Sequence, residues 1–486
     1  MSQAQLLVAM LVLPLAGALG VLLARRNPNL REAVTLVTGG LVLGVVGMLV
    51  AGFDAAAATT VVLARPLPGM EIALSPEPLG LLFALVAGFL WPVTSIYAIG
   101  YMRGHHEENQ TRFFTFFAVS ISATLGIAMS ANLLTLFLFY ELLTLATFPL
   151  VTHAGTPEAK RAGRVYLGLL MGTSVMFLLL AVVWTWQVAG TLDFADGGIL
   201  PADADPTLLG ILLLLFVFGA GKAAMMPFHR WLPAAMVAPT PVSSLLHAVA
   251  VVKAGVFTVL KVAVYVFGIE RIGELASAEF LAYLAGFGIL AASAVAMKKD
   301  NLKARLAYST ISQLGYITLG AMLGTASGVV GGSMHIATHA FGKITLFFCA
   351  GAILVAAHKK KVSELDGLGR RMPFTMAAFT IGSLSVIGLP PTGGTWSKWF
   401  LVQGTLDAGQ WVLAGVLLAS SLLNIAYLLV IPVRGFFRPP ALADGEALAL
   451  RAPFACRLAI GVTVAGTLFL FFLPGPLHRF ALGVLP

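Results

Sequence analysis

The sequence alternates between long apolar runs and short polar stretches. Fourteen runs approach the ~20 residues that a helix needs to cross a bilayer. They lie approximately at 4–24, 33–53, 78–101, 112–130, 132–152, 164–188, 208–230, 241–267, 279–297, 303–323, 329–357, 374–403, 410–432 and 454–473. The pattern predicts an all-α polytopic membrane protein. The stretch Thr59–Glu77 is broken by prolines and carries Arg65 and Glu71, so its β-branched start predicts a small hairpin instead of a span.

The polar stretches differ in charge according to their place in the chain. Lys and Arg gather after odd-numbered runs, whereas stretches after even-numbered runs are poor in both. The basic residues concerned are Arg25, Arg26, Arg31, Arg103, Arg112, Lys160, Arg161, Arg164, Lys298, Lys299, Lys303, Arg305, Lys359, Lys360, Lys361, Arg370, Arg371, Arg434, Arg438 and Arg451. Because basic loops remain on the cytoplasmic side, this alternation predicts that both termini lie outside. The N-terminus lacks a basic region before its apolar run, which favours a first span over a cleaved signal peptide.

Composition excludes several classes of protein. The chain is 59% hydrophobic and 10% charged, whereas soluble domains carry about 25% charged residues. The net charge of +9 is explained by the loops, so no nucleic-acid partner is predicted. Cys349 and Cys456 lie in separate apolar runs and supply neither a disulfide framework nor iron–sulfur ligands. Gly221-Lys222 lacks the flanking residues of a phosphate-binding loop. No cofactor and no metal are predicted.

Charged side chains inside the apolar runs are the candidate functional residues. Lys222 ends a run that begins at Leu208, and Pro227 follows five residues later. An ammonium in hydrocarbon costs roughly 2.5–3.5 kcal/mol, and a helix break at membrane depth needs polar partners for its freed backbone. The combination is typical of an ion path. The alternative is a helix that ends near Pro227 with Lys222 reaching to the surface.

Two further spans carry isolated charges. Glu141 lies in the middle of its run, where it either is protonated and bonded to a hydroxyl or pairs with a lysine, for which Lys222 is the natural candidate. Lys253 lies in another run, with His247 six residues before it and Lys261 eight residues after it. Lys261 shares the face of Lys253 but is expected to extend toward the surface near the helix end.

A stripe of titratable residues follows in the eleventh run. His335, His339 and Lys343 are spaced i, i+4 and i+8, about 12 Å along one helix face. Histidine titrates near neutral pH, so such a stripe can pass protons through water. A zinc pair would need a third ligand, which is not evident, and the remaining alternative is a pair of histidines bonded to neighbouring helices. Lys398 follows a second helix break, either within the path or reaching to the surface.

The two breaks suggest an internal symmetry. One lies near Pro227 and the other at Gly388–Gly394, and each has a lysine and a tryptophan nearby. They fall in runs seven and twelve, which run in opposite directions. Broken helices at matching positions predict an inverted-repeat transporter.

Several segments together resemble one family. They are FYELLTLATFPLV, GAGKAAMMPFHRWLPAAMVAPTPVSSLLHAVAVVKAGVF, LAYSTISQLGYI, HIATHAFGKITLFFCAGAI and IGLPPTGGTWSKWF. The chain resembles the antiporter-like subunits, which include the ion-pumping membrane subunits of respiratory complex I, the large subunits of Mrp cation/proton antiporters, and subunits of membrane-bound hydrogenases. The matching segments run from about Phe114 to Trp399, and the number of spans extends the resemblance over nearly the whole chain.

The resemblance implies the architecture and the residue roles. It implies N-terminal helices in 1–111, inverted five-helix repeats in 112–268 and 269–435, and a last helix in 436–486, with helices seven and twelve broken. It implies proton transfer by Glu141, Lys222, Lys253, His339, Lys343 and Lys398, and His247 and His335 are further candidates. Lys398 stands where some members carry glutamate, as in the D-type Mrp subunit. About thirteen residues follow the last run, so neither the long lateral helix of complex I's distal subunit nor the extended A-type Mrp C-terminus is expected.

The function implied is that of a non-enzymatic, proton-translocating subunit of a multisubunit Na⁺/H⁺ antiporter in a bacterial or archaeal plasma membrane. Its partners would be other membrane subunits, protons, Na⁺ in the antiporter and the lipid bilayer. The alternative is the equivalent subunit of a redox-driven complex, either complex I or a membrane-bound hydrogenase.

Overall fold

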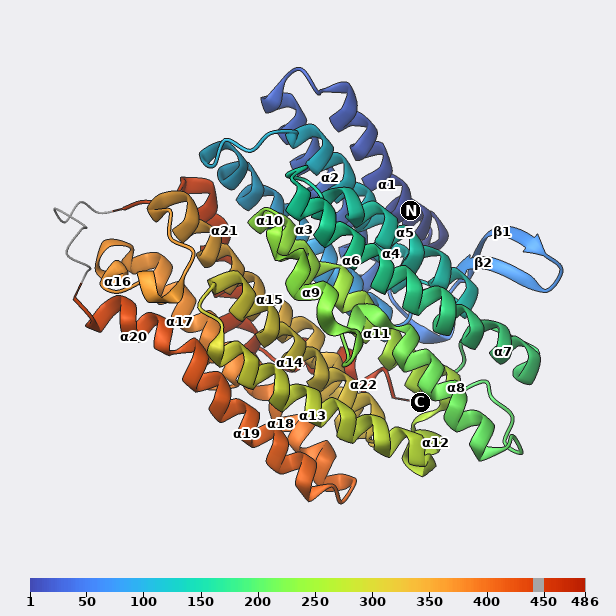
Figure 1. Cartoon of the computed structure of the whole chain (residues 1–486). Helices are drawn as coiled ribbons and strands as arrows, with labels where there is room; N and C mark the ends of the chain where they lie inside the picture. The colour runs from blue at the N-terminus through green and yellow to red at the C-terminus, as the bar shows by residue number, and fades with distance from the viewer. Residues whose placement is uncertain (440–449, 486) are drawn as a thin grey trace.

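The computed structural model describes residues 1–439 and 450–485 as a bundle of long helices (Figure 1). The predicted C-terminal segment 436–486 is therefore described except for 440–449 and 486. The helices are α1 (Gln3–Leu23), α2 (Pro28–Ala51), α3 (Pro78–Gly104), α4 (Gln110–Ala128), α5 (Leu133–Val151), α6 (Pro157–Thr173), α7 (Leu179–Ala189), α8 (Pro206–Gly219), α9 (Trp231–Ala234), α10 (Thr240–Ser244), α11 (Val251–Val262), α12 (Ile269–Glu274), α13 (Ala276–Lys298), α14 (Leu302–Met322), α15 (Ala326–Ala357), α16 (Leu368–Arg371), α17 (Pro373–Ile387), α18 (Gly394–Asp407), α19 (Trp411–Leu428), α20 (Val430–Phe437), α21 (Phe454–Phe472) and α22 (Gly475–Leu482).

The observed helices lie at the positions in the chain where the sequence pattern predicts spans. Each of the predicted runs coincides with helical structure, and within the described residues eleven helices are long and apolar enough to cross a bilayer. Two of the remaining runs form the shorter apolar helices α8 and α17. The third, α14, is 21 residues long but rich in hydroxyl side chains and therefore less apolar. The multi-pass all-α fold is confirmed, whereas the count of fourteen spans stays a prediction.

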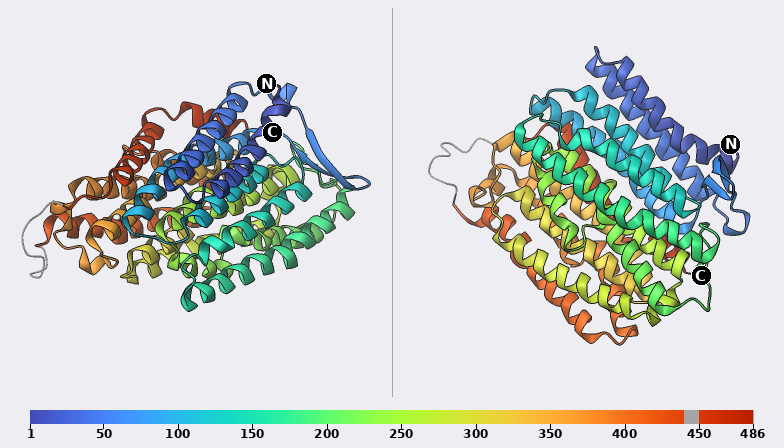
Figure 2. Two further views of the ribbon diagram at one scale, coloured as in Figure 1. Left: turned by 90° about the horizontal axis from the view of Figure 1, so that it is seen from above. Right: turned by 45° about the vertical axis from the view of Figure 1, so that its right-hand side comes forward.

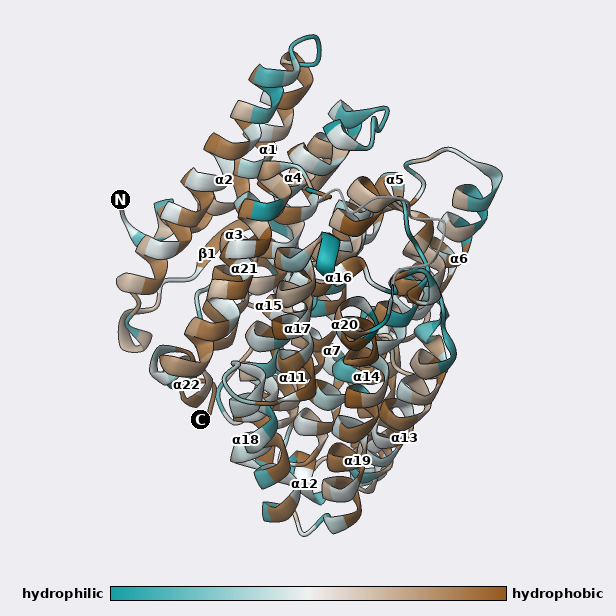
Figure 3. Ribbon diagram, turned by 90° about the vertical axis from the view of Figure 1, so that its left-hand side faces the viewer, coloured by the Kyte–Doolittle hydropathy of each residue, from teal (hydrophilic) through white to brown (hydrophobic). Residues whose placement is uncertain are grey.

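Local signals explain where the elements begin. Asn27, Asn132 and Thr156 each accept a backbone N–H with their side chain at the start of α2, α5 and α6. The predicted hairpin is confirmed, because β1 (Val61–Leu67) pairs antiparallel with β2 (Met70–Leu74). Apolar positions dominate the middle of the helices, and polar positions gather at their ends (Figure 3).

The two ends of the bundle differ in charge. We call the end that carries the basic loops, with α16 and the turn after α1, the basic end, and the opposite end, with the loop 190–205, the acidic end. Both termini and the hairpin lie at the acidic end (Figures 1 and 2). Both termini thus lie on one side of the bundle, as the alternating loops predict.

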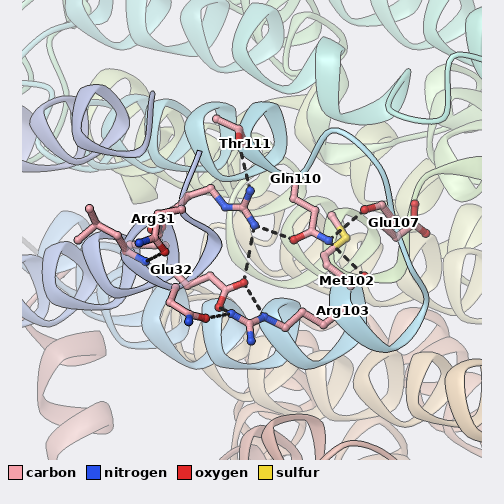
Figure 4. A network of polar contacts seen from close by, with 11 residues as sticks. Arg31, Glu32, Met102, Arg103, Glu107, Gln110 and Thr111 are labelled. Atoms are coloured by element: carbon pink, nitrogen blue, oxygen red, sulfur yellow. Dashed lines mark hydrogen bonds and ion pairs between the residues drawn. The ribbon is translucent and has the colours of Figure 1, made fainter. Parts of the chain in front are cut away.

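A polar network joins three helices at the basic end. Arg31 of α2 donates to Gln110 at 2.7 Å and to Thr111 at 3.2 Å in α4. Arg103 of α3 pairs with the buried Glu32 of α2, with Nε 2.9 Å from Oε1. Figure 4 shows that these side chains converge from the three helix ends. The network fixes the N-terminal helices to one another.

The centre of the molecule is the helical segment around α11. Every residue from Thr240 to Phe267 is buried. The segment includes α10, α11 and two π-helical turns at Leu245–Val249 and Ala263–Phe267, and it packs against α3, α14 and α15. A helix surrounded on all sides by protein can carry charges that a lipid-facing helix cannot.

Both predicted helix breaks are present. The helix α8 ends at Gly219, and single 3₁₀ turns at Gly221–Ala223 and Phe228–Arg230 follow before α9. The helix α17 ends at Ile387, and α18 begins at Gly394. Gly388 has a φ of 92°, and a Cβ there would lie 2.6 Å from Cδ of Lys398. Glycine is thus needed both for this backbone conformation and to leave space for the lysine.

Candidate functional site

Lys222 lies inside the first break, in the turn Gly221–Ala223, and its side chain points to α5. Its Nζ donates to the carbonyl oxygen of Tyr140 at 2.8 Å and to Oγ1 of Thr144 at 2.7 Å. The Tyr140 hydroxyl accepts the backbone N–H of Lys222 at 3.0 Å. The lysine is fully buried, so the alternative of a surface-reaching side chain is wrong in this structure.

Glu141 is adjacent to this contact but does not share it. It lies within electrostatic range of Lys222, yet neither of its covered carboxylate oxygens has a hydrogen-bond partner among the described residues. Glu141 shares a stripe of α5 with Leu138, Leu142 and Leu145, which are exposed. The predicted direct pair with Lys222 is therefore not formed here.

The helix α11 brings Lys253 into contact with the second half of the chain. A Cβ at Gly255 would lie 2.1 Å from the backbone nitrogen of Ala223, so α11 packs directly on the turn that carries Lys222. On the other side, Nζ of Lys253 lies 2.6 Å from Nδ1 of His339 in α15. Both residues are buried. The structure thus brings together two predicted residues from different helices.

The predicted stripe on α15 is present, and its members contact different helices. The rings of His335 and His339 stack with centroids 5.6 Å apart. Nδ1 of His335 lies 2.9 Å from Oγ of Ser397 in α18. Lys343 turns toward α14, where its Nζ donates to Oγ of Ser309 at 2.7 Å.

Lys398 lies just after the second break. Its Nζ donates to the carbonyl oxygen of Ile387 at 3.1 Å, which is one of the carbonyls freed by the end of α17. It also lies 3.4 Å from the hydroxyl of Tyr316 and 3.3 Å from Oγ of Ser421. Lys222 and Lys398 are thus held alike, because each amine binds a helix carbonyl and a hydroxyl.

His247 is not brought into contact with the other candidates by a hydrogen bond. It is fully buried in the π-helical turn before α11, with its ring 4.7 Å from that of Phe347. Neither of its ring nitrogens has a hydrogen-bond partner within the described residues.

The expectation that Lys261 extends to the surface is wrong. Its side chain is fully buried, and Nζ lies 2.7 Å from Oε1 of Glu77, whose side chain is 17% exposed. It also donates to the carbonyl oxygen of Ser130 at 2.6 Å. Its partners lie at the acidic end, on the β2–α3 junction and the α4–α5 turn, which is why the local sequence around Lys261 does not reveal them.

Neutral polar residues between α14 and α19 were also not predicted. Ser309 and Tyr316 of α14 contact Lys343 and Lys398. The other buried residues of the set are Ser312 of α14 and Ser420 and Tyr427 of α19. Hydroxyl side chains are common in apolar helices, so their number alone does not indicate a functional site. The available signal was their spacing, which is three and four residues in α14 and seven residues in α19.

Known proteins are similar to this chain in sequence. Residues 130–424 match the family described as NADH:quinone oxidoreductase/Mrp antiporter, transmembrane. The NADH-quinone oxidoreductase subunit N of Desulforudis audaxviator is 34% identical over 364 residues, which are 74% of this chain and 71% of that protein. The F(420)H(2) dehydrogenase subunit L of Methanosarcina mazei is 36% identical over 340 residues, which are 64% of this chain and 49% of that protein. The chain thus covers between half and about seven tenths of these relatives.

Solved structures share the fold over the whole chain. A chain of the Mrp complex from Dietzia sp. DQ12-45-1b superimposes with a TM-score of 0.88 at 21% identity, covering 100% of this chain and 97% of that chain. A chain of the membrane-bound sulfane sulfur reductase, an archaeal respiratory membrane complex, gives a TM-score of 0.85 at 23% identity, covering 99% and 97%.

Proposed function

Because the chain belongs to the NADH:quinone oxidoreductase/Mrp antiporter transmembrane family, we propose that it is the proton-conducting membrane subunit of a multisubunit complex. The observation that carries this proposal is the 2.6 Å contact between Lys253 of α11 and His339 of α15. It joins titratable groups of the two halves of the chain in a region shielded from lipid, as proton transfer across a membrane requires.

The path that we propose begins at Lys222. A proton held there passes to Lys253, since α11 packs directly on the turn of Lys222. From Lys253 it reaches His339 and Lys343, and it leaves by way of Lys398. His335 and His247 lie beside this path and take part in its hydration.

Glu141 would regulate the first step. A carboxylate that moves toward Lys222 stabilises its ammonium and retains the proton, and one that moves away favours release. The absence of a direct contact in this structure corresponds to the releasing arrangement.

We also propose that 112–268 and 269–435 form inverted repeats with helices seven and twelve broken. The support is that Lys222 and Lys398 each bind a backbone carbonyl and a hydroxyl at a break. Each break then supplies one proton-binding lysine.

We propose first that the complex is a cation/proton antiporter, in which neighbouring subunits couple proton flow to Na⁺ export. A specific observation favours a second candidate, a redox-driven complex: the relatives include subunits of an NADH-quinone oxidoreductase and an F(420)H(2) dehydrogenase. Mass spectrometry of the complex, purified in mild detergent from its native membrane, separates the two. Flavin or iron–sulfur subunits in the complex support the redox-driven pump, and small membrane subunits alone support the antiporter.

Transport in membrane vesicles tests the conduit itself. We expect Lys222→Ala, Lys398→Ala and Glu141→Ala to abolish proton translocation while the complex still assembles. Lys160→Ala, at an exposed lysine of the basic end, is the control and should transport normally. Full transport by an assembled Lys222→Ala complex would refute the proposal.

A further inference from the structure

A cavity of about 260 Å³ lies between α3, α15, α21 and α22, apart from the proposed proton path. All the residues that line it are apolar. Two of them, Phe469 and Leu473 of α21, are more than half exposed, so the cavity opens on the surface of the bundle. Because α3 and α21 are long and apolar enough to cross a membrane, this opening lies at the depth of the hydrocarbon. We call this space the α21 cavity.

The α21 cavity extends from the acidic end to the middle of the bundle. On α3 it is lined from Leu82 to Phe89, a distance of roughly 10 Å at 1.5 Å per residue. Phe89 and Phe341 of α15 form its inner end, with ring centroids 5.6 Å apart. Half of the hydrocarbon core of a bilayer is about 15 Å thick. The cavity thus follows most of the depth of one leaflet, as an acyl chain does.

The size of the cavity excludes a helix from a partner subunit. One turn of an α-helix is about 5.4 Å long and 10 Å across and therefore occupies roughly 400 Å³. The whole cavity is smaller than this. An apolar cavity excludes water and accepts hydrocarbon, so the α21 cavity suits a single extended hydrocarbon chain.

A basic side chain lies on the helix at the outer end of the cavity. The helix α22 packs on α3 and α15 and buries Leu477 and Ala481. Pro476 of this helix lines the cavity, and the exposed Arg479 is three residues further, on the same side of the helix. Arginine binds phosphate oxygens with two parallel hydrogen bonds. The phosphate of a lipid whose chain enters the cavity therefore has a partner at this end.

The helix that covers the cavity also holds the second break. The backbone N–H of Gly393 donates to the carbonyl oxygen of Thr467 at 3.0 Å, and Nε1 of Trp396 donates to that of Phe471 at 3.0 Å. Leu470 lies between these two carbonyls and lines the cavity. A Cβ at Gly393 would lie 2.6 Å from the Cβ of Leu470. Packing in the cavity therefore supports the helix on which the break rests.

We propose that the α21 cavity binds one acyl chain of a phospholipid from the leaflet at the acidic end, with the lipid phosphate on Arg479. The bound acyl chain keeps α21 packed on α3 and α15, and it thereby stabilises the second break, where α18 begins. The proposal is independent of the proton path, and its test does not measure transport.

Photolabelling of the assembled complex in vesicles tests the binding. The probe is a phosphatidylglycerol with a diazirine at the end of one acyl chain, and mass spectrometry locates the label. We expect label on the peptides around Phe341 and Gly466, at least fivefold above the label on the exposed face of α19. Leu473→Trp and Val86→Phe, which fill the cavity from α21 and from α3, should each reduce the cavity label at least fivefold. Arg479→Gln should reduce it severalfold.

Two variants serve as matched controls. Leu41→Trp adds the same bulk at an exposed position of α2, away from the cavity. Arg65→Gln removes an exposed arginine of the acidic end, in the hairpin. Both variants should leave the label in the cavity unchanged.

Amide hydrogen exchange tests the effect on the second break. Removal of bound lipid by detergent should speed the exchange of the peptide that contains Gly393 severalfold in the wild type, because α21 loses its packing. The exchange in Leu473→Trp should not respond to lipid removal, because the indole takes the place of the acyl chain. Equal acceleration in both proteins would contradict the link between the cavity and the break.

Three results of the photolabelling would overturn the lipid site. A cavity label no stronger than that on the exposed face of α19 would be explained by contact with the bilayer or by a subunit that covers the cavity. Wild-type labelling of Leu473→Trp and Val86→Phe would show that the label lies outside the cavity. Displacement of the label by a long-chain quinone, but not by unlabelled phosphatidylglycerol, would assign the cavity to a prenyl tail.

Discussion

Among the described residues, the ammonium of Lys222 has one side-chain hydroxyl as a hydrogen-bond partner and also lies over the ring of Tyr140. Thr144 supplies that hydroxyl at 2.7 Å, and the second partner is a backbone carbonyl that mutation cannot remove. The protonated state of this lysine can therefore be altered by one methyl-for-hydroxyl exchange on α5.

We expect Thr144→Val to destabilise the subunit by about 1.5–3 kcal/mol, because a buried charged donor loses one of its two hydrogen-bond partners. Transport should fall several-fold, since the ammonium becomes harder to form. The measurements are the unfolding midpoint in detergent and the transport rate in vesicles. Thr185→Val is the control, because the Thr185 hydroxyl donates only to Ala181 of its own helix; equal losses in both variants would contradict a specific role of Thr144.

His153, just after α5, makes stability depend on pH. Burial, together with the nearby Arg112, lowers the pKa of His153 to about 4. The unfolded chain, with a histidine pKa near 6.5, takes up the proton first, so the stability is fully present above pH 6.5 and falls as the pH drops toward 4. We expect the unfolding midpoint of His153→Asn to fall less than that of the wild type between pH 7 and pH 4.5. Parallel pH profiles would contradict this prediction.

At the scale of elements, the approach of α11 to the Lys222 turn depends on Gly255. A Cβ there would lie 2.1 Å from the Ala223 nitrogen, which belongs to the backbone and cannot rotate away. We expect Gly255→Ala to cost about 1–3 kcal/mol by overpacking and to reduce transport, because Lys222 is displaced. Gly44→Ala in α2, where a Cβ meets nothing within 4 Å, should leave both unchanged or slightly raise stability.

The Glu77–Lys261 pair fastens the elements of the acidic end. Breaking a buried pair leaves one charge uncompensated, so Glu77→Gln should lower stability by about 3 kcal/mol. The double variant Glu77→Gln, Lys261→Met should recover much of that loss, because no buried charge remains. The unfolding midpoints of the single and double variants test this prediction. Additive losses of stability in the double variant would contradict the pairing.

The elements were predictable where their signal is local. Apolar length reveals the spans, and Pro227 and Gly388–Gly394 reveal the breaks. The position of Lys222 within a 3₁₀ turn, instead of at a helix end, depends on packing against Gly255 and Tyr140. The partners of Lys261 and Lys343 lie far away in the sequence, so their burial could not be deduced from the residues beside them.

At the scale of the whole molecule, the basic and acidic ends predict which compartment each faces. Cys349 and Cys456 are buried, so neither native cysteine should react with a thiol-labelling reagent. In intact cells, a membrane-impermeant maleimide should label Asp203→Cys of the acidic end. It should label Lys160→Cys of the basic end only after the cells are opened. The reverse pattern would place both termini in the cytoplasm and contradict the orientation predicted from the loop charges.

The complete burial of Thr240–Phe267 has a consequence for biosynthesis. This segment carries His247, Lys253 and Lys261, and it leaves the ribosome before α14 and α15, which enclose it in the finished protein. Lys253 lies at the middle of the segment, and a lysine at the centre of a helix opposes insertion by roughly 2.5–3.5 kcal/mol. The segment therefore has to be sheltered by the earlier helices α3 to α8 or by the insertion machinery until the second half of the chain has been made.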